Sequence, residues 1–335
     1  MMRDVIIIGG GVAGMKSAVD LSAMGFKVLL IEKSDRLGGK LLNWHCLFPT
    51  FTAANEVLTQ MLESVEAAKN VEVIYSTEVT HFDSKSVTTA ENERLECRAV
   101  ILASGFTLFD ARIKEEYGYG IYNGVYTTVD LERMFNEGTL PQGDKAPMRI
   151  ALLHCVGSRD EKICQSHCSK VCCVTGVKQA VELKKVYPNA DIFNFYMDIR
   201  MFGPGYEEMY RDAQIKSNIH FVRGRISEAA PTMDGKIQIK AEDTLTARPL
   251  RMSVDMLILI VGMRGNDSNE AFAKSANLKL SPNGFMQSRD SFLNNTSSNQ
   301  EGIFYAGAIT APKNIGESLG DGAHAAQAVY RFLTK

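Results

Sequence analysis

A glycine-rich turn near the N-terminus constrains the fold of this chain more than any other feature. The stretch DVIIIGGGVAGMKSAVDLSAMGFKVLLIEK has the pattern of a strand, a tight turn, a helix and a second strand. Val5–Ile8 is an apolar run of the kind found in buried parallel strands, and apolar residues recur at helical spacing over Ala13–Met24. Because strand, helix and strand in this order form a parallel βαβ unit, the stretch predicts an α/β fold.

Three glycines and one acidic residue complete the pattern of a dinucleotide site. Gly9, Gly11 and Gly14 form G-x-G-x-x-G at the turn, and Glu32 closes the second strand twenty-one residues after Gly11. Gly9 permits the turn, Gly11 lets the backbone approach a pyrophosphate, and Gly14 lets the helix pack on the strand. The Glu32 carboxylate is suited to accept hydrogen bonds from an adenosine ribose. We therefore predict a dinucleotide site rather than a purely structural turn.

Later segments narrow the choice of dinucleotide. RLGGKLL (Arg36–Leu42) follows the second strand, and RAVILASGF (Arg98–Phe106) predicts a strand that ends in small residues. EGIFYAGAITAPKNIGESLGDGAHAAQAV predicts a strand, a glycine loop and a helix that begins near Gly320. This layout resembles the two-dinucleotide-binding-domain flavoproteins of the thioredoxin reductase type, which implies FAD. Their C-terminal strand usually ends in Gly-Asp, and the Asp holds the flavin ribityl chain. This chain has Gly307-Ala308 instead, so backbone or water has to replace that contact.

The same resemblance implies a set of FAD-binding residues and one residue beside the flavin. The set is Gly9, Gly11, Val12, Ala13, Gly14, Glu32, Lys33, Gly39, Lys40, Leu42, Val79, Ala103, Ser104, Gly105, Gly307 and Ala308. Lys313 follows the C-terminal strand, where a cation would favour the reduced flavin. The alternative for Lys313 is an exposed loop lysine paired with Glu317. The N-terminus of the helix near Gly320 would offer N–H groups to the flavin O2.

Between the flavoprotein segments lies an insert of domain size. We predict a discontinuous FAD-binding domain over residues 1–110 and 252–335, with VDMLILIVGMR returning the chain to it, and an inserted module over 111–251. In the module, Met148–Ser158 predicts a first strand, Val171–Val186 a helix and ADIFNFYMDI a second strand, with further strands in IHFVRGRISEA and KIQIKAE. This is the layout of an NAD(P)H domain. Its first turn, however, carries CVGSRDEKICQSHCSKVCC where a second G-x-G-x-x-G is expected.

Five of the seven cysteines lie in those nineteen residues. In a reducing compartment such a group is catalytic, redox-active or metal-binding rather than a set of structural disulfides. Thiolates are the preferred ligands of iron–sulfur clusters, and the N–H groups of a helix that opens at Cys172 and Cys173 favour thiolate. The spacing is not that of bacterial ferredoxins. A zinc site that includes His154 and His167 and a set of inert buried thiols are the alternatives, and no thioredoxin-like C-x-x-C is present.

Four stretches, CVGSRD, HCSKVCC, VKQAVELKKVYPNADIFNFYMDIRMFGPGYEEMYRDAQ and APKNIGES, resemble the A-type subunits of heterodisulfide reductases and their relatives. The resemblance covers nearly the whole chain and implies electron transfer between FAD and a [4Fe-4S] cluster in the inserted module. By this resemblance the cluster ligands are Cys155, Cys168, Cys172 and Cys173, and Cys164 is a spare thiol or a substitute ligand. Because no C-x2-C-x2-C-x3-C-P motif occurs, the chain resembles the short bacterial forms, including those of sulfur-oxidising complexes. The family implies B- and C-type partner subunits and a homodimer.

Composition bears on other partners. The formal net charge of -2 gives no electrostatic reason to expect nucleic acid or an anionic membrane. The sequence shows neither the pattern of a signal peptide nor an apolar run long enough to span a bilayer, so we expect no membrane insertion and a cytoplasmic location.

Cys46 and Cys97 are isolated in sequence and are interpreted as ordinary buried or surface residues. No catalytic triad or pair of carboxylates stands out, so the cofactors are expected to carry the chemistry.

Two classes of oxidoreductase fit these observations. The first is an electron-transfer subunit of a heterodisulfide-reductase-like complex, with FAD and one cluster, in sulfur or thiol/disulfide metabolism. The second is a stand-alone NAD(P)H-dependent flavoprotein that reduces a disulfide or sulfide, with its cysteines as a zinc site or as reactive thiols. A scaffold in which the flavin only stabilises the fold is a third class. The cysteine group favours the first.

Overall fold

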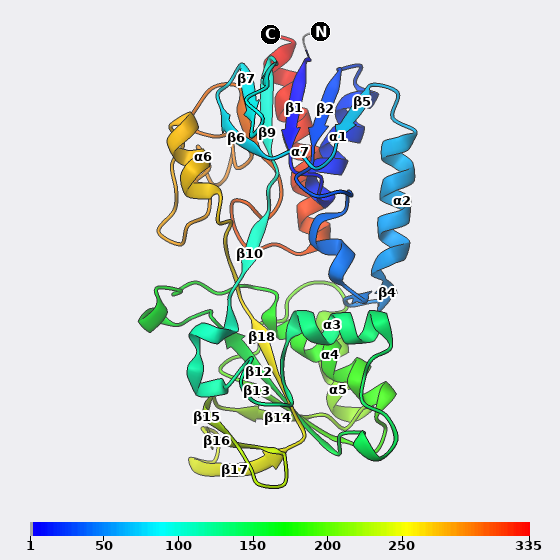
Figure 1. Cartoon of the computed structure of the whole chain (residues 1–335), viewed down its shortest axis with the longest axis vertical. Coiled ribbons are helices and arrows are strands. Elements are labelled where there is room, and N and C mark those ends of the chain that lie inside the picture. Colours follow the sequence, from blue (N-terminus) through cyan, green and yellow to red (C-terminus); the bar gives the residue numbers. More distant parts are fainter. Residues whose placement is uncertain (1–2) are drawn as a thin grey trace. The chain divides into compact units, whose positions relative to one another are not determined.

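The computed structural model describes residues 3–335, which fall into two compact units. The first unit comprises the residues up to Leu42, Ala54–Thr107 and Arg264–Lys335, and the second comprises Asn43–Ala53 and Leu108–Met263. The chain passes between the units in β10 (Phe106–Leu108) and β19 (Met263–Gly265), which pair with each other. Figure 1 labels the elements of both units.

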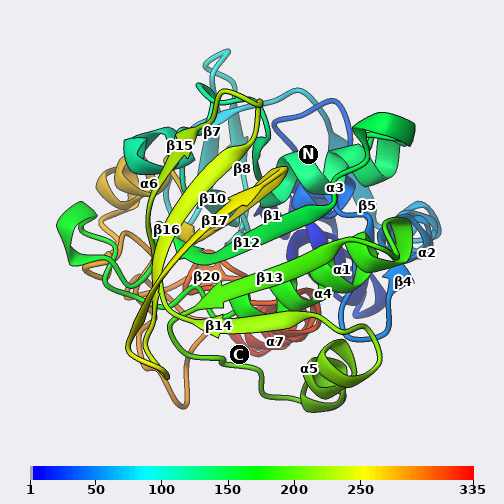
Figure 2. The ribbon, with the colours of Figure 1, turned by 90° about the horizontal axis from the view of Figure 1, so that it is seen from below.

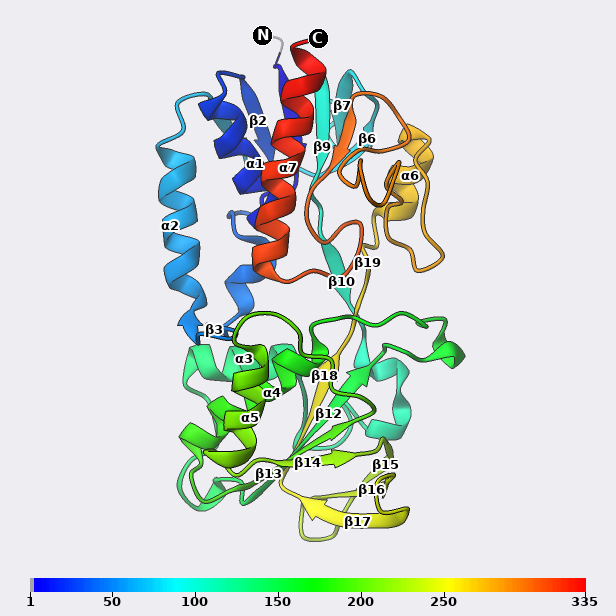
Figure 3. The ribbon, with the colours of Figure 1, turned by 180° about the vertical axis from the view of Figure 1, so that it is seen from behind.

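The first unit is built on a five-stranded parallel sheet. Its strands, in spatial order, are β20 (Ile303–Tyr305), β9 (Ala99–Leu102), β1 (Val5–Ile8), β2 (Val28–Ile31) and β5 (Val71–Ile74). Every residue of β1, β2 and β9 is buried, because both faces of these strands are covered. Two helices, α1 (Val12–Ala23) and α7 (Ile315–Leu333), pack against each other on one face of the sheet, as Figure 3 shows.

Smaller elements complete the first unit. α2 (Ala54–Glu66) packs against α1, and the short helix η1 (Gly39–Asn43) begins directly after Gly38. An antiparallel sheet of β6 (Val79–Phe82), β7 (Ser86–Thr89) and β8 (Arg94–Glu96) contacts α6 (Asn269–Ala276) through β6. The rings of Phe82 and Phe272 meet edge to face, with their centroids 5.4 Å apart. These elements enclose one side of the apolar core of the unit.

The second unit repeats the parallel arrangement. Its sheet has the order β11 (Val125–Thr127), β18 (Met256–Val261), β12 (Arg149–Val156), β13 (Asp191–Tyr196) and β14 (His220–Arg223). Figure 2 shows β12, β13 and β14 side by side, with α4 (Cys172–Val186) in contact with the first two. The remaining elements are α3 (Thr128–Glu137), α5 (Tyr206–Ile215), the hairpin of β3 (Cys46–Leu47) and β4 (Thr52–Ala53), and an antiparallel sheet of β15 (Ile226–Pro231), β16 (Ile237–Asp243) and β17 (Arg248–Val254).

Two boundaries differ from the sequence prediction. The run MLILIV is predicted to return the chain to the FAD-binding domain, but as β18 it is hydrogen-bonded between β11 and β12 of the second unit. Both parallel sheets use strands that are apolar on both faces, so apolarity alone does not assign a strand to one of them. Residues 43–53 also belong to the second unit, although they follow segments of the first.

The C-terminal helix begins five residues earlier than predicted. α7 starts at Ile315, not near Gly320, and Asn314 and Glu317 form a capping box at its N-terminus. The glycines of this segment suggest a later start, but Gly322 lies inside the helix for a packing reason. A Cβ on Gly322 would lie 2.6 Å from the carbonyl oxygen of Ala13, so α7 needs a residue without a side chain to approach α1.

Across residues 3–335, none of the helices combines the length and the apolar character that a membrane span requires.

Candidate functional site

The glycine turn of the first unit has the geometry of a phosphate-binding loop. Gly9 has a φ of +109°, and a Cβ there would lie 2.6 Å from the carbonyl oxygen of Ala103. A Cβ on Gly14 would overlap the carbonyl oxygen of Gly9. By contrast, a Cβ on Gly11 would meet no atom within 4 Å. Two of the three glycines are therefore required by the protein itself, and the third faces open space.

The N-terminus of α1 leaves its backbone donors available. Gly11 is the N-cap residue, no side chain caps the helix there, and the first turn has no acidic residue. The first N–H groups of a helix have no partner within the helix, and the helix dipole adds partial positive charge at this end. The peptide groups of Val12 and Ala13 therefore form, with the open space beside Gly11, an anion-binding position.

Glu32 holds the turn in place. Its Oε2 accepts a hydrogen bond from the Gly10 N–H at 2.6 Å, and its Oε1 accepts from the Ser34 N–H and hydroxyl, each at 2.8 Å. A carboxylate has about four lone-pair positions, so these contacts leave room for further donors. The predicted ribose contact is therefore compatible with the loop contacts that Glu32 already makes.

A second pair of glycines, Gly38 and Gly39, packs against the same turn. The N–H of Gly38 donates to the carbonyl oxygen of Gly10 at 2.9 Å, and a Cβ on Gly39 would lie 3.0 Å from the Gly11 Cα. Lys40 lies with its ammonium 5.4 Å from the centre of the Phe106 ring. Burial lowers the pKa of the Lys40 ammonium, against a smaller opposing effect of Asp267. Positive charge thus lies beside the glycine turn.

The strand that ends beside the turn contributes a polar group without a partner. Ala103, Ser104 and Gly105 follow β9 directly, and the Ser104 carbonyl accepts a hydrogen bond from the Asn266 side chain at 2.8 Å. The Ser104 hydroxyl is buried and has no hydrogen-bond partner in the part of the chain that the structure describes. Because buried hydroxyls are nearly always hydrogen-bonded, this group fits a bound polar ligand.

Three other predicted residues differ in their surroundings. Lys33 is exposed and forms a surface ion pair with Glu78 at 2.7 Å, Val79 is buried in β6, and Leu42 is exposed. The structure therefore brings Glu32, the second glycine pair and the backbone that follows β9 against the glycine turn, whereas the ammonium of Lys33 is paired with an acid at the surface.

The ammonium of Lys313 contacts residues that follow the C-terminal strand β20 and a residue of α7. Its ammonium donates to the carbonyl oxygen of Gly307 at 3.1 Å, to the hydroxyl of Thr310 at 2.7 Å and to the carboxylate of Asp321. The predicted alternative partner, Glu317, takes part in the capping box of α7. Ala308, at the position of the family's Asp, is buried. Lys313 thus ties the strand end to α7.

Three of the clustered cysteines lie where β12 ends and α4 begins in the second unit. Cys155 lies near the end of β12, and Cys172 and Cys173 open α4. The Cys172 thiol donates a hydrogen bond to Cys155, and the charges of Cys168 and Cys173 both act on Cys172. The Lys170 N–H points to the sulfur of Cys168 at 3.3 Å. Cys164, by contrast, is exposed.

The electrostatics around these sulfurs favour negative charge. The hydrogen bond from Cys172 lowers the pKa of Cys155 to about 7 despite its burial, and Arg159, Arg225 and Arg200 act in the same direction. The same interaction raises the pKa of Cys172, so the two thiols share one proton. Burial raises the pKa of Cys173 to about 11. The three arginines therefore favour the thiolate form of Cys155.

The backbone of the cysteine loop is strained. Cys155, Arg159, Cys164 and Lys170 all have φ values between 54° and 63°, the left-handed region that residues with a side chain seldom adopt. Such strain concentrates where the surrounding structure holds a binding or catalytic loop in one conformation. The strained backbone is therefore typical of a binding or catalytic loop and not of a simple connection between β12 and α4.

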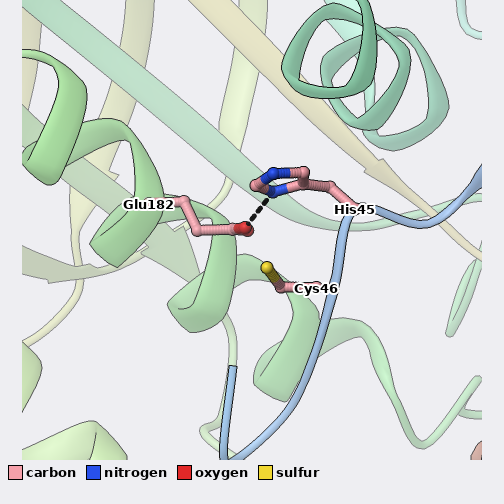
Figure 4. A group of neighbouring side chains, drawn as sticks. All are labelled: His45, Cys46 and Glu182. Carbon is pink, nitrogen blue, oxygen red and sulfur yellow. Dashed lines mark hydrogen bonds and ion pairs between the residues drawn. The ribbon is translucent and has the colours of Figure 1, made fainter. Parts of the chain in front are cut away.

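Sequence reasoning missed a second group of ligating side chains. His45 and Cys46 are not associated with any partner by the sequence, but the structure places them beside Glu182 of α4 (Figure 4). One nitrogen, one sulfur and one oxygen of this group lie within 4.8 Å of one another. The available signal was the adjacent His-Cys pair and the acid and lysine at Glu182 and Lys178 on an otherwise apolar stretch of helix.

Comparison with known proteins agrees with this architecture. Residues 3–329 match the family described as pyridine nucleotide-disulphide oxidoreductase. The chain is 30% identical to the A-type iron-sulfur subunit of CoB--CoM heterodisulfide reductase from Methanocaldococcus jannaschii. It is 29% identical to the A-type subunit of the H2/formate:CoB-CoM heterodisulfide,ferredoxin reductase from Methanococcus maripaludis. Each match covers 98% of this chain but 64% of the relative, so the chain spans less than two thirds of their length. The resemblance to A-type heterodisulfide reductase subunits is thereby confirmed.

Solved structures confirm the fold class. Thioredoxin reductase of T. acidophilum matches with a TM-score of 0.71 and 19% identity, over 100% of this chain and 99% of the other. Thioredoxin reductase of Lactococcus lactis matches with a TM-score of 0.70 and 21% identity, over 99% of both chains. The prediction of a flavoprotein fold with two nucleotide-type domains of the α/β class is therefore correct.

Proposed function

The chain belongs to the pyridine nucleotide-disulphide oxidoreductase family, and from this premise we propose that it is an electron-transfer subunit of a heterodisulfide-reductase-like complex. It would carry FAD in the first unit and one [4Fe-4S] cluster in the second, and act in sulfur or thiol/disulfide metabolism. The observation that supports the proposal is the position of Cys155 near the end of β12 and of Cys172 and Cys173 at the N-terminus of α4, with Cys168 four residues before Cys172. In a second dinucleotide domain, that position would bind phosphates.

We propose that FAD is bound by the glycine turn of the first unit and its neighbours. Its pyrophosphate would bind the N–H groups of Val12 and Ala13 in the open space beside Gly11. Glu32 would accept the ribose hydroxyls, and the unpartnered hydroxyl of Ser104 would meet a polar group of the cofactor. Bound FAD supplies exchange of electrons in pairs or singly. The residues of this unit bind and orient it.

The second unit offers a cluster four sulfurs and a positive surrounding. Cys155, Cys168, Cys172 and Cys173 are the proposed ligands, and a bound cluster supplies transfer of single electrons. Arginines and helix N–H groups stabilise the negative charge that four thiolates bring, as they already favour thiolate at Cys155. Exposed Cys164 is not needed as a ligand.

Lys313 is proposed to affect the flavin as part of an ion pair. Its ammonium is held by Asp321 and by the carbonyl oxygen of Gly307. A paired ammonium adds less positive charge to its surroundings than a lone one. The lysine would therefore act mainly by holding the Gly307–Ala308 peptide, which stands where the related flavoproteins carry Gly-Asp.

Partners and location follow from the relatives. Those relatives are named as A subunits of heterodisulfide reductases, which supports partner subunits for this chain. We propose that these partners are of the B and C type, that this chain forms a homodimer, and that the complex is cytoplasmic. The competing function, a stand-alone NAD(P)H-dependent disulfide or sulfide reductase, rests on the thioredoxin reductase fold. Against it stands the turn after β12, where cysteines occupy the place of the phosphate-binding glycines.

Cofactor analysis separates the two functions. The protein is purified anaerobically, and flavin, iron, acid-labile sulfide and zinc are measured per chain. The proposal expects about four iron and four sulfide for each FAD, as one cubane cluster requires, together with negligible direct reduction of the flavin by NADH or NADPH. Zinc without sulfide, with rapid reduction by NADH, would replace the proposal by the stand-alone reductase.

A further inference from the structure

A second group of metal-ligating side chains lies in the second unit, apart from the cysteine loop. The Nδ1 of His45 is 2.7 Å from the Oε1 of Glu182, and the sulfur of Cys46 points toward the same carboxylate (Figure 4). Glu182 is ten residues beyond Cys172 on α4, which corresponds to about 15 Å along a helix. The group is therefore separate from the four sulfurs at the start of α4.

Buried charges support these three side chains. Lys178 donates to Glu132 at 2.5 Å and forms an ion pair with Glu182 at 3.0 Å. The side chains of these three charged residues are at most 5% exposed. The second oxygen of Glu132 accepts the backbone N–H of His45 at 2.8 Å, and Lys178 also donates to the carbonyl oxygen of Cys46 at 3.1 Å. The network thus fixes the segment that carries both His45 and Cys46 against α4.

The buried network holds more carboxylates than ammonium groups. Two carboxylates, those of Glu132 and Glu182, contact the single ammonium of Lys178. Buried charge without a partner is costly, so proteins pair it or place a metal ion against it.

From this geometry we propose that His45, Cys46 and Glu182 bind one divalent transition-metal ion of the zinc type. One nitrogen, one sulfur and one oxygen within 4.8 Å of one another make a donor set that zinc accepts, with water in the fourth position. A divalent ion and the Cys46 thiolate, together with Lys178 and the two carboxylates, bring the network to zero charge. Calcium and magnesium prefer oxygen ligands alone and are disfavoured by the thiolate.

Binding requires a small rearrangement and releases a proton. At 2.7 Å the His45 nitrogen and the Glu182 oxygen share a hydrogen bond. An ion with ordinary zinc bond lengths holds two such atoms roughly 3.4 Å apart, so the pair opens by several tenths of an ångström. The imidazole proton moves to Nε2 when Nδ1 binds the metal. The Cys46 thiol proton goes to solvent, so one proton is released for each ion bound. The His45 side chain is 38% exposed and gives the ion access.

Cobalt(II) tests the proposal because it binds zinc sites and its thiolate complexes absorb strongly in the near ultraviolet. The full chain, with the flavin and iron that it carries on anaerobic purification, is treated with a chelator for loosely bound metal and titrated with Co²⁺. We expect one Co²⁺ per chain, thiolate-to-cobalt absorption and release of one proton. Cys46→Ser should abolish the absorption and weaken binding by about 100-fold or more, since even changes behind the ligands cost about 10–100-fold.

Two further variants keep the test decisive. Cys97→Ser removes an isolated buried cysteine and should leave the titration unchanged. Glu132→Gln leaves all three ligands in place but removes a charge that holds Lys178 and the His45 backbone, and should weaken Co²⁺ binding by about 10–100-fold. The proposal is overturned if wild type binds no stoichiometric Co²⁺, or if Cys46→Ser, with an unchanged metal-free melting temperature, binds as wild type does. Flavin and iron contents report on the proposed function separately, and neither should change in Cys46→Ser.

Discussion

Two glycines of the N-terminal turn, Gly11 and Gly14, should respond differently to the same substitution. Gly14→Ala places a Cβ inside van der Waals contact with the Gly9 carbonyl oxygen, whereas Gly11→Ala places one in open space. Gly11 has φ -74° and ψ -176°, which alanine adopts without strain. The two variants therefore separate what the fold requires from what the cofactor requires.

The expected magnitudes follow from these contacts. Overpacking against backbone costs about 3 kcal/mol at the upper end of its usual range, and the better helix propensity of alanine returns about 1 kcal/mol. Gly14→Ala should therefore lose about 2 kcal/mol of unfolding free energy without FAD. Gly11→Ala should stay within about 0.5 kcal/mol, as surface substitutions do. If its methyl group displaces two charge-assisted hydrogen bonds to phosphate, worth about 1.5 kcal/mol each, FAD binding weakens by roughly 100-fold.

Two measurements on FAD-free protein check this difference. Urea unfolding gives the stability of each variant, and quenching of flavin fluorescence during titration gives the affinity for FAD. The reasoning is refuted if Gly11→Ala binds FAD with wild-type affinity, because the open space would then not hold the pyrophosphate. It is also refuted if Gly11→Ala is destabilised as much as Gly14→Ala.

Two further predictions concern the second unit. Lys178→Met leaves Glu132 and Glu182 buried without their ammonium and should cost about 3–5 kcal/mol in urea unfolding, and a loss below about 1 kcal/mol would show that the carboxylates are protonated or relaxed to solvent. Burial acts to raise the pKa of Asp130, but hydrogen bonds from Thr127 outweigh it and lower the pKa. Asp130→Asn should therefore cost about 1 kcal/mol at pH 7. The difference in unfolding free energy between wild type and Asp130→Asn should have its full size above the unfolded pKa of about 3.9. It should vanish as the pH falls through the lower pKa of the folded protein. A difference that grows as the pH falls would contradict the assignment.

Local patterns in the sequence predicted much of the first unit. β1 was predicted at its observed bounds, and α1 within one residue at either end, because an apolar strand, glycines with distinct steric tasks and an amphipathic helix are all set by neighbouring residues. The start of α7 was missed because its glycines serve a contact with α1, which lies about 300 residues away in sequence. β18 was assigned to the wrong sheet because strand partners are not encoded in apolarity.

The cysteine loop was visible in the sequence because its residues are neighbours, whereas the His45 group joins residues that are far apart in the chain. The family resemblance implied Cys155, Cys168, Cys172 and Cys173 as ligands, which stays a prediction. Because β12 and α4 are consecutive elements, Cys155 and Cys172 do come together. Cys46 was interpreted as an ordinary residue because its partner Glu182 is 136 residues away. Contacts between distant segments depend on the packing of the hairpin against α4, which no short pattern reports.

The central claim is that the loop between β12 and α4 holds a cluster, and low-temperature EPR of the dithionite-reduced protein tests it most directly. The account predicts a cluster signal in wild type and in Cys164→Ala. In Cys172→Ala the signal should disappear while the flavin content is unchanged, because FAD is proposed to bind the other unit. No cluster signal in wild type, with zinc in place of iron and sulfide, would contradict the claim, as would a signal that survives in Cys172→Ala but is lost in Cys164→Ala.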